Sequence, residues 1–401
     1  MKIIERSKYL NQLISVMGTP EIKVITGIRR SGKSILLDNF RKYLEKALGE
    51  KANIIHVDYN LKSTKPLLDS DALYDFIENS YVGGKQNFVL IDEVQMCPDF
   101  EKAINYLHAL QKYDIYITGS NAFLLSSDLA TLFTGRTYAI EMYPFSFKEY
   151  LEYFERNDLE NAFSDYVLEG GMAGSYIYKT IEEKRKYLTE VYDTLIVQDI
   201  NNRYKIRNEA LLNSLSDFMM DNISNLTSLR NISNIVSPTE NENETKHKTV
   251  GNYIQYLTEA FAFYRVRRYD IRGKKYLASQ DKYYLADHAF RFAKLGSKNM
   301  DYGRIYENIV AIELLRRGYD IYVGALYNKE IDFVATKRDE VTYIQVSDDI
   351  TNPETLDREM SSLLGIKDAY PKMIIANTKH DEYTKDGVKI VDLAHWLASV
   401  A

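Results

Sequence analysis

The chain has 401 residues, of which 45% are hydrophobic and 27% are charged, and its formal net charge is -6. This length supports two or three domains with their own cores, and the acidic balance argues against a protein that coats nucleic acid over its whole surface. The single cysteine, Cys97, excludes an intrachain disulfide, and no apolar run approaches a membrane span, so we expect a cytoplasmic protein without membrane contact.

The first motif follows a short amphipathic helix that ends at Gly18 and an apolar strand around Val24 and Ile25. The next residues, Gly-Ile-Arg-Arg-Ser-Gly-Lys-Ser, match the phosphate-binding loop G-x-x-x-x-G-K-[ST] between a strand and a helix. Glycines let this backbone wrap around a polyphosphate, and the helix N-terminus directs amide dipoles at it. The pattern predicts a nucleotide site formed by Gly27, Arg29, Arg30, Ser31, Gly32, Lys33, Ser34 and Ile35.

Two side chains of this loop have specific expected roles. Lys33 would place its positive charge on the β- and γ-phosphates, and the Ser34 hydroxyl would be a ligand of Mg²⁺. A chance glycine-rich turn is the alternative interpretation. The apolar strand before the loop and the apolar spacing of residues 35–48 after it, which predicts a helix, argue against that alternative.

A second signal is the sequence Phe-Val-Leu-Ile-Asp-Glu at residues 88–93. Four apolar residues followed by two acids predict a buried parallel strand with carboxylates at its C-terminal tip, where ligands bind in open α/β sheets. We expect Asp92 to hold Mg²⁺ and Glu93 to activate the attacking water as a general base. A strand that simply ends in solvated acids is the alternative.

Two weaker signals come next along the chain. A short strand at residues 115–118 leads into Ser120 and Asn121, which would contact the γ-phosphate or the attacking water, or would cap the next helix as a turn. Arg136 follows Gly135 and would act as an arginine finger on the nucleotide of a neighbouring subunit, or would be a structural surface arginine. The first interpretation of Arg136 predicts a homo-oligomer.

Together these motifs resemble the AAA+ ATPases, and in particular a prokaryotic family of predicted AAA+ ATPases whose C-terminal half is a domain of unknown function. The resemblance rests on residues 27–34, 91–95, 118–121, 135–136 and 143–150, and it extends over essentially the whole chain. It implies ATP as the nucleotide, Mg²⁺ as the metal, and a helical lid after the core. Its motifs are specific for nucleotide binding but not for a biological task.

The middle of the chain is mainly helical in pattern, with a long helix expected over residues 181–200 and a helix-helix turn at residues 170–174. Residues 209–295 resemble a winged helix, with a recognition helix expected over 248–257. A basic hairpin that turns near Gly273 is either a phosphate-backbone contact for DNA or merely a solvated hairpin, and winged helices also serve protein contacts. Its basic residues are Arg265, Arg267, Arg268, Arg272, Lys274 and Lys275.

The last third alternates helices and strands in a pattern that resembles the restriction-endonuclease-like fold. Nuclease members of that fold use two acids for Mg²⁺ and a lysine to orient hydroxide. Glu307 and Asp332 match the helix and strand acids, but Gln345 stands at the second acid position and Ser347 at the lysine position. We therefore expect an interaction scaffold without nuclease activity, in which Glu307 and Asp332 are ordinary solvated acids.

The sequence thus predicts an α/β protein with four parts: an AAA+ core (1–145), a helical lid (146–205), a winged-helix-like domain (206–297) and a degenerate restriction-endonuclease-like domain (298–401). The expected function is Mg²⁺-dependent ATP binding and hydrolysis coupled to conformational change, acting on a nucleic acid or a protein partner. The alternative is a slow-turnover, ATP-gated switch that binds DNA or protein through its C-terminal half.

Overall fold

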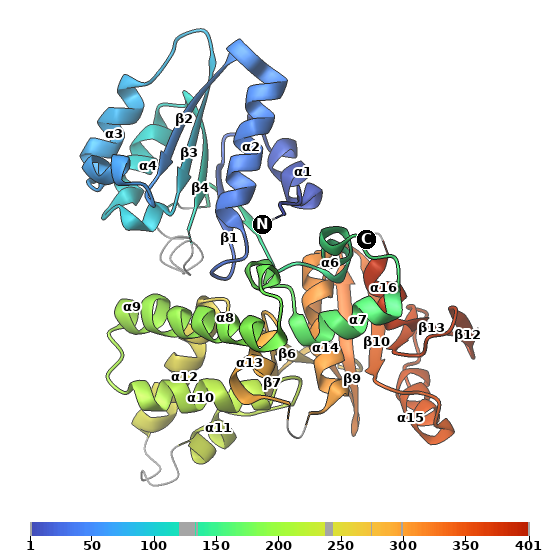
Figure 1. Cartoon of the computed structure of the whole chain (residues 1–401). Helices are drawn as coiled ribbons and strands as arrows, with labels where there is room; N and C mark the ends of the chain where they lie inside the picture. Colours follow the sequence, from blue (N-terminus) through green and yellow to red (C-terminus); the bar gives the residue numbers. More distant parts are fainter. Residues whose placement is uncertain are drawn as a thin grey trace. The chain divides into compact units, whose positions relative to one another are not determined.

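We describe a computed structural model of the chain over residues 2–119, 133, 135–236, 244–273, 275–297 and 300–399 (Figure 1). Its contacts divide it into two compact units. The N-terminal unit comprises Lys2–Met142 together with Glu259–Phe261, and the C-terminal unit comprises Tyr143–Thr258 and Ala262–Ala401. None of the helices within these described ranges has the length and apolar character that a bilayer crossing demands.

The N-terminal unit is built on a five-stranded sheet in the order β2-β3-β4-β1-β5, and every pair of neighbouring strands is parallel. The strands are rich in apolar residues on both faces, as expected for a parallel sheet covered on both sides. Because β4 lies between β1 and β3, the carboxyl ends of these three strands are neighbours. The strands are β1 (Ile22–Thr26), β2 (Ala52–Asp58), β3 (Gln86–Asp92), β4 (Tyr113–Thr118) and β5 (Thr137–Glu141).

Helices cover both faces of this sheet (Figure 1). Along β3, Phe88 and Leu90 pack with apolar residues of α1 and α2, whereas Val89 and Ile91 pack with those of α3 and α4. This alternation follows from the two-residue side-chain period of a strand. The helices are α1 (Ser7–Ser15), α2 (Lys33–Leu48), α3 (Ser70–Asn79) and α4 (Phe100–Ala109), with short turns of 3₁₀ helix at η1 (Gly49–Lys51), η2 (Lys62–Leu67) and η3 (Val94–Met96).

The C-terminal unit contains an eight-stranded sheet in the order β12-β13-β11-β10-β9-β8-β6-β7. In its centre, β8, β9 and β10 pair antiparallel and β10 pairs parallel with β11, so the chain order is α14, three antiparallel strands, α15 and a parallel strand. The strands are β6 (Phe263–Asp270), β7 (Lys275–Leu285), β8 (Asp320–Leu326), β9 (Lys329–Lys337), β10 (Glu340–Ser347), β11 (Lys372–Ala376), β12 (Tyr383–Lys385) and β13 (Val388–Asp392).

Two helices cover the centre of this sheet. Helix α14 packs on β8 and β10, and α15 packs on β9, β10 and β11. Both begin at a side-chain cap, Asp301 for α14 and Asn352 for α15, and α15 has Pro353 at its first position. They are α14 (Tyr302–Arg316) and α15 (Pro353–Leu364).

The other helices of the C-terminal unit come mainly before β6. Capping boxes start α6 at Ser146 and α8 at Thr180, as their sequences indicate. The helices are α6 (Phe147–Phe154), α7 (Leu159–Glu169), α8 (Ile181–Thr194), α9 (Asn202–Tyr204), α10 (Glu209–Asp221), α11 (Leu229–Val236), α12 (Glu244–Glu259), α13 (Ala289–Leu295) and α16 (Leu393–Ala398), with η5 (Ala173–Ile177) and η6 (Leu195–Asn201).

The segment that we expected to be a lid packs within the C-terminal unit. Gly171 N donates to Asp287 Oδ2 at 2.7 Å, and Asp193 Oδ1 accepts from Lys294 Nζ at 2.7 Å. The strands of the predicted winged helix and of the predicted nuclease-like domain also share one sheet, because β6 pairs with β8. The division into four domains therefore stays a prediction. The contacts within the chain place nearly all of the predicted lid, winged-helix and nuclease-like parts in one compact unit.

One predicted helix differs from the structure. Residues 181–200 are not one α-helix: α8 ends at Thr194 and the π-helical segment η6 follows. A π-helix has one extra residue per hydrogen-bonded turn, so it shifts the register of the side chains that follow it. Nothing in the residue types of this segment explains the change.

Candidate functional site

The loop between β1 and α2 has the backbone conformation that its glycines permit. Gly27 has φ +132° and Gly32 has φ +100°, both in the region that L-residues rarely adopt. A Cβ atom added at Gly27 would lie 2.1 Å from Met142 O, so this position also has no space for a side chain. Both constraints confirm that glycine is required at Gly27 for physical reasons.

Lys33 is the first residue of α2, and its side chain folds back over this loop. Its Nζ donates to Gly27 O at 2.8 Å and to Ile28 O at 3.0 Å, and the residue is buried. A second cation stabilises the loop, because Arg6 Nη1 donates a hydrogen bond to Ser31 O at 3.0 Å. The Lys33 ammonium is thus held by neutral carbonyl oxygens at the mouth of a helix N-terminus, an arrangement suited to an anion.

Several groups of the loop fit a polyphosphate. Among the described residues, Ser31 Oγ and Thr26 Oγ1 are buried and have no hydrogen-bond partner, so each can still donate to a ligand. Arg29 is half-buried, Arg30 is exposed with φ +66°, and the side chains at positions 34 and 35 are exposed at the start of α2. These residues therefore supply two unused hydroxyl donors together with the exposed cation of Arg30.

Asp92 lies at the end of β3, buried beside this loop. Its carboxylate accepts a hydrogen bond from the Thr118 hydroxyl, at the end of the neighbouring strand β4. Burial raises the pKa of Asp92, while hydrogen bonds from Thr118 and Ser34 act to lower it. The Ser34 hydroxyl and the Asp92 carboxylate, the two predicted Mg²⁺ ligands, are therefore within hydrogen-bonding reach of each other.

Glu93 has an unusual backbone. Its φ of +54° and ψ of +47° are left-handed, which is uncommon for a residue with a side chain and often occurs at functional sites. Its N–H donates to Thr118 Oγ1 at 3.1 Å, and Gln95 Nε2 donates to its carboxylate. Thr118 thus orients Asp92 and Glu93 at once, and Gln95 fixes the Glu93 carboxylate.

Two residues of this site were not predicted from the sequence. Thr118 holds both acids, and Asp58, which ends β2, pairs in register with Asp92 and contributes to raising its pKa. Both end strands of the same parallel sheet, and this position is the signal that would have indicated them. Neither lies in the same local motif as the two acids, because each ends a different strand.

The remaining predicted residues of the nucleotide site have different outcomes. Ser120 and Asn121 lie outside the described residues. Arg136 is exposed and precedes the amino end of β5, whose far end, Glu141, pairs with Thr26 beside the loop. A strand of 5 residues spans about 16 Å, so Arg136 lies at the opposite edge of the sheet from its own phosphate loop. Arg136 therefore does not contribute to the phosphate loop of its own chain.

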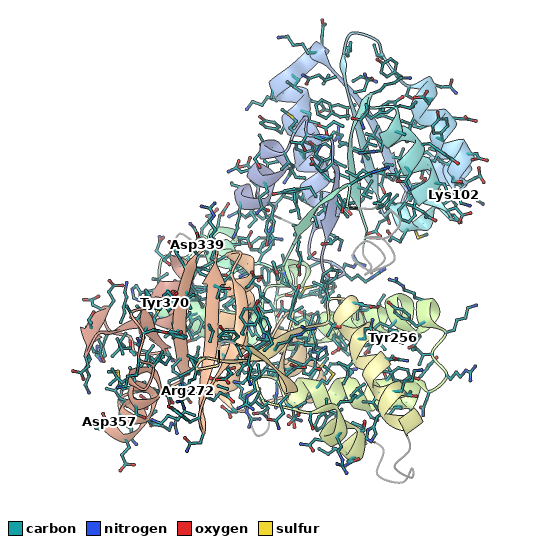
Figure 2. The ribbon with its side chains drawn as sticks, turned by 180° about the vertical axis from the view of Figure 1, so that it is seen from behind. Lys102, Tyr256, Arg272, Asp339, Asp357 and Tyr370 are labelled. Carbon is teal, nitrogen blue, oxygen red and sulfur yellow. The ribbon has the colours of Figure 1, made fainter. Side chains whose placement is uncertain are left out.

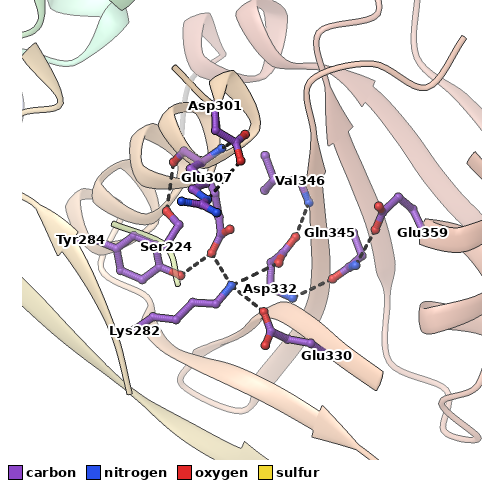
Figure 3. A network of polar contacts seen from close by, with 11 residues as sticks. Ser224, Lys282, Tyr284, Asp301, Glu307, Glu330, Asp332, Gln345, Val346 and Glu359 are labelled. Atoms are coloured by element: carbon purple, nitrogen blue, oxygen red, sulfur yellow. Dashed lines mark hydrogen bonds and ion pairs between the residues drawn. The ribbon is translucent and has the colours of Figure 1, made fainter. Parts of the chain in front are cut away.

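A second polar cluster lies in the C-terminal unit, where Glu307 of α14 and Asp332 of β9 face the same lysine (Figure 3). Lys282 Nζ is 2.7 Å from Glu307 Oε1, 2.7 Å from Glu330 Oε1 and 3.5 Å from Asp332 Oδ1. Tyr284 also donates to Glu307 Oε1, at 2.6 Å. Burial raises the pKa of Glu307 to about 8, and the neighbouring carboxylate of Asp332 adds to this.

The expectation of solvated acids here is therefore wrong. Glu307 and Asp332 are enclosed because β7, which the sequence pattern did not connect with them, brings Lys282 between them. At the predicted second acid position, Gln345 Oε1 accepts from Asp332 N at 2.7 Å, and its Nε2 donates to Glu359 at 2.6 Å. Within the described ranges, no group of three or more His, Cys, Asp or Glu residues is arranged to hold a metal ion.

Ser347, at the predicted lysine position, donates its hydroxyl to Asp349 O at 3.1 Å and so caps the turn after β10. It takes no part in the contacts that join Lys282 to its three carboxylates. The lysine of this cluster thus comes from β7 and not from the strand on which the nuclease pattern would place it.

The predicted basic residues lie on the β6–β7 hairpin and are not equivalent. Arg265 pairs with Asp281 at 2.6 Å, which neutralises it. Arg267, Arg272 and Lys275 are exposed, Arg268 is half-buried, and Lys274 lies outside the described residues. The exposed cations are thus fewer than the sequence pattern indicates.

Comparison with known proteins agrees with this geometry. Residues 19–151 match the family described as an AAA domain, and residues 160–301 match a domain of unknown function, DUF8612. An AAA domain supports ATP-binding NTPase activity. The chain is 37% identical over 400 residues to an uncharacterized protein of Haemophilus influenzae, which covers 98% of each chain. It is 26% identical over 366 residues to an uncharacterized protein of Methanocaldococcus jannaschii, covering 83% of this chain and 76% of that one.

Similar solved structures include two of the replication initiator DnaA, one bound to AMPPCP and single-stranded DNA and one, from Aquifex aeolicus, bound to AMPPCP. Their TM-scores are 0.33 and 0.32 at 16% and 19% identity. They cover 65% and 64% of this chain and 89% and 90% of their own. Similarity at this level carries no functional assignment, whereas the Haemophilus influenzae relative spans the whole chain. The chain therefore belongs to the family of that uncharacterized protein, and it joins an N-terminal AAA domain to a domain of unknown function.

Proposed function

We propose that the protein is an Mg²⁺-dependent ATPase that couples its nucleotide state to conformational change. The observation that carries this proposal is the junction of the phosphate loop with the tips of β3 and β4, where Thr118 links Asp92 to Glu93 and Ser34 hydrogen-bonds Asp92. This junction supplies the anion-binding loop, the oxygen ligands and the base that phosphoryl transfer to water requires.

Each side chain has a defined role in this proposal. The loop amides and the Lys33 ammonium would bind phosphate oxygens, and Lys33 would exchange its contacts with Gly27 O and Ile28 O for contacts with the nucleotide. Ser34 and Asp92 hold Mg²⁺, which when bound neutralises charge on the phosphates. The Glu93 carboxylate, oriented by Gln95, accepts a proton from the attacking water.

A neighbouring subunit would complete the site. Because Arg136 lies at the opposite edge of the sheet, we propose that it reaches the γ-phosphate of an adjacent copy as an arginine finger. This role requires a homo-oligomer. Ser120 and Asn121, which follow β4 in sequence, stay candidates for contacts with the γ-phosphate or the water.

For the C-terminal unit we propose a restriction-endonuclease-like core without nuclease activity. The order α14, β8, β9, β10, α15, β11 and its strand directions support the fold, and Lys282 among the acids supports the loss of a metal site. The order α10, α11, α12, β6, β7, with a bridge between Thr227 and Asp281, supports the winged helix. Nicking of DNA that needs a metal and is abolished in Asp332→Ala would contradict this proposal.

We propose that this unit contacts a nucleic acid through the exposed cations of the β6–β7 hairpin, with a protein partner as the other candidate. The slow-turnover switch differs from an ATP-driven motor only in rate: a switch keeps ATP bound for minutes or longer, and a motor turns over within seconds. Steady-state hydrolysis at low salt, with and without duplex DNA, separates the two. Stimulation by DNA that added salt removes would favour contacts with the phosphate backbone.

The ATPase proposal is tested by two substitutions with matched controls. Lys33→Ala should abolish ATP binding, whereas Glu93→Gln should bind ATP and lower kcat by roughly 10²–10⁴-fold. Lys102→Ala, exposed on α4, and Glu101→Gln, half-buried beside it, are the matched controls and should leave hydrolysis unchanged. Fluorescent-nucleotide binding and phosphate release are the measurements. Unchanged hydrolysis in both site variants would refute the assignment.

A further inference from the structure

Three tyrosine rings from different strands meet on one face of the C-terminal sheet. Tyr269 of β6, Tyr276 of β7 and Tyr322 of β8 have ring centroids 5.7, 5.9 and 5.3 Å apart in their three pairs. The register explains the meeting, since Tyr269 lies opposite both Tyr276 and Gly324, and Gly324 is two residues from Tyr322. Residues paired in this way point to the same face of a sheet.

These rings pack against the hydrophobic cluster that residues of α15 also cover on the same sheet. Tyr269 and Tyr322 pack against a buried cluster that includes Ile271 and Ile331. A Cβ atom added at Gly324 would lie 2.8 Å from Ile331 Cβ, so the glycine lets these strands and the rings above them pack closely. The rings are therefore held on a rigid platform of strands rather than on a loop.

The face is open to solvent at its aromatic residues. Tyr276 is 60% exposed and Tyr370, which precedes β11, is 44% exposed. The ring of Tyr370 lies 6.4 Å from that of Tyr343 on β10, and Tyr343 belongs to the buried cluster against which Tyr269 and Tyr322 pack. We call Tyr269, Tyr276, Tyr322 and Tyr370 the tyrosine surface. Exposed aromatic area on this scale indicates a binding function, because it leaves apolar surface in water.

Cations lie beside the tyrosine surface. Arg267 is exposed on β6, two residues before Tyr269. The Arg272 guanidinium lies 5.3 Å from the exposed ring of Tyr327, at the tip of the hairpin, and Lys275 is exposed. Figure 2 labels Arg272 in the turn after β6 and Tyr370 just before β11. The carboxylate of Asp270 accepts from Arg272 N and Gly273 N and is thus engaged in the turn.

We propose that the tyrosine surface binds single-stranded nucleic acid, with bases stacked on the exposed rings and phosphates paired with Arg267, Arg272 and Lys275. Exposed rings on strands with flanking cations are the combination that binds single strands, because unstacked bases offer their faces whereas a duplex hides them. This inference rests on the proposed nucleic-acid contact of the C-terminal unit, and it is independent of ATP hydrolysis.

The test is fluorescence anisotropy with the full chain, without nucleotide, at low salt. The probes are labelled oligo(dT) and oligo(U) of about 20 nucleotides and a duplex of the same length. We expect single strands to bind more tightly than the duplex, and the DNA and RNA probes show which sugar is preferred. Tyr276→Ala should weaken single-strand binding roughly 5- to 150-fold, whereas Tyr276→Phe, which keeps the ring, should stay within about twofold.

Tyr106 offers a matched control, since it is 62% exposed on α4 of the N-terminal unit; Tyr106→Ala should leave the affinity unchanged. Arg267→Gln should reduce the slope of log affinity against log salt concentration by about one, the amount expected for one lost phosphate contact. Circular dichroism checks that each variant is folded. If Tyr276→Ala is not folded, Tyr370→Ala takes its place in the test.

The possible results distinguish failure of single-strand binding by the tyrosine surface from failure of the proposed nucleic-acid contact as a whole. Binding that favours the duplex, or that ignores both tyrosine substitutions, overturns the single-strand inference and retains a DNA contact through the cations. Absence of binding to every probe overturns both and leaves a protein as the partner. Loss of hydrolysis in Lys33→Ala with intact single-strand binding supports the inference, because the two sites are then independent.

Discussion

Two buried lysines in this chain lie in opposite surroundings. Lys33, at the start of α2, donates to the neutral carbonyl oxygens of Gly27 and Ile28. Lys282, on β7, lies against the carboxylates of Glu307, Glu330 and Asp332. Both side chains are almost fully enclosed, so burial alone does not distinguish them.

The difference lies in what each positive charge can still do. The Lys33 ammonium lies inside the glycine-rich loop at a helix N-terminus, so its charge is placed for an anion that enters the loop. Several carboxylates overcompensate the ammonium of Lys282, and burial there raises the pKa of Glu307 to about 8. The first arrangement is suited to binding a ligand, and the second stabilises the fold of its own unit.

The largest effect should come from removing the ammonium that the acids surround. Lys282→Met leaves buried carboxylates without their cation, and we expect it to lower the free energy of unfolding of the C-terminal unit by about 3–5 kcal/mol. Trp396, the single tryptophan, lies on α16 of this unit and reports its unfolding by fluorescence in denaturant.

The matched control is Lys294→Met, in which the lost partner is the exposed Asp193 and the cost should stay below about 1 kcal/mol. ATP affinity should be unchanged in Lys282→Met, whereas Lys33→Met should show the reverse pattern, with no nucleotide binding and little change in Trp396 unfolding. Equal stability of Lys282→Met and Lys294→Met would remove the distinction between the two lysines.

A smaller effect tests whether orientation matters at the nucleotide site. Thr118→Val removes the hydroxyl that donates to Asp92 and accepts from Glu93 N–H, without changing the size of the side chain much. Hydrogen bonds to charged groups contribute about 1.5–3 kcal/mol, so kcat should fall by roughly 10- to 150-fold. Thr118→Ser keeps the hydroxyl and should retain most activity. A Val variant with wild-type kcat would show that Thr118 does not position the acids.

The most gradual effect is a pH dependence of stability that arises from Glu307 in the lysine cluster. The pKa of Glu307 is raised in the folded chain from 4.5 to about 8, so its protonated form stabilises the fold below pH 4.5 and this contribution is lost as the pH rises through 8. Unfolding of Glu307→Gln should lack this loss. For a single proton, the free energies of unfolding of the two proteins should diverge by at most about 1.4 kcal/mol per pH unit. Parallel curves for the two proteins between pH 5 and pH 9 would contradict the raised pKa.

The nucleotide site was predictable to a large extent because its parts are local. The loop of residues 27–34 contains its glycines, lysine and serine within one strand-loop-helix unit, and the buried strand that ends in Asp92 and Glu93 carries its own apolar signature. The structure confirms the strand, the loop conformation and the helix. It adds Thr118 and Asp58, which no local pattern connects with the two acids.

The C-terminal unit was predictable in its elements but not in its interactions. Helix α14, the strands around Asp332 and the hairpin near Gly273 follow the expected order, whereas β12 was not expected from the sequence. The sequence pattern placed Glu307 and Asp332 correctly on a helix and a strand and treated them as solvated. Their enclosure depends on Lys282, which α13 and the start of α14 separate from Glu307 along the chain.

By itself, the sequence determined the phosphate loop, the acids that follow it and the alternation of strands and helices, because steric and hydrogen-bonding rules act over a few neighbouring residues. Only the tertiary structure decided that Lys282 compensates the acids of the C-terminal unit and that Tyr269, Tyr276 and Tyr322 share one face. Strand order and register determine which of these side chains come together, and both arise from packing over the whole sheet. The charge that surrounds a side chain is therefore known only once the sheet is assembled.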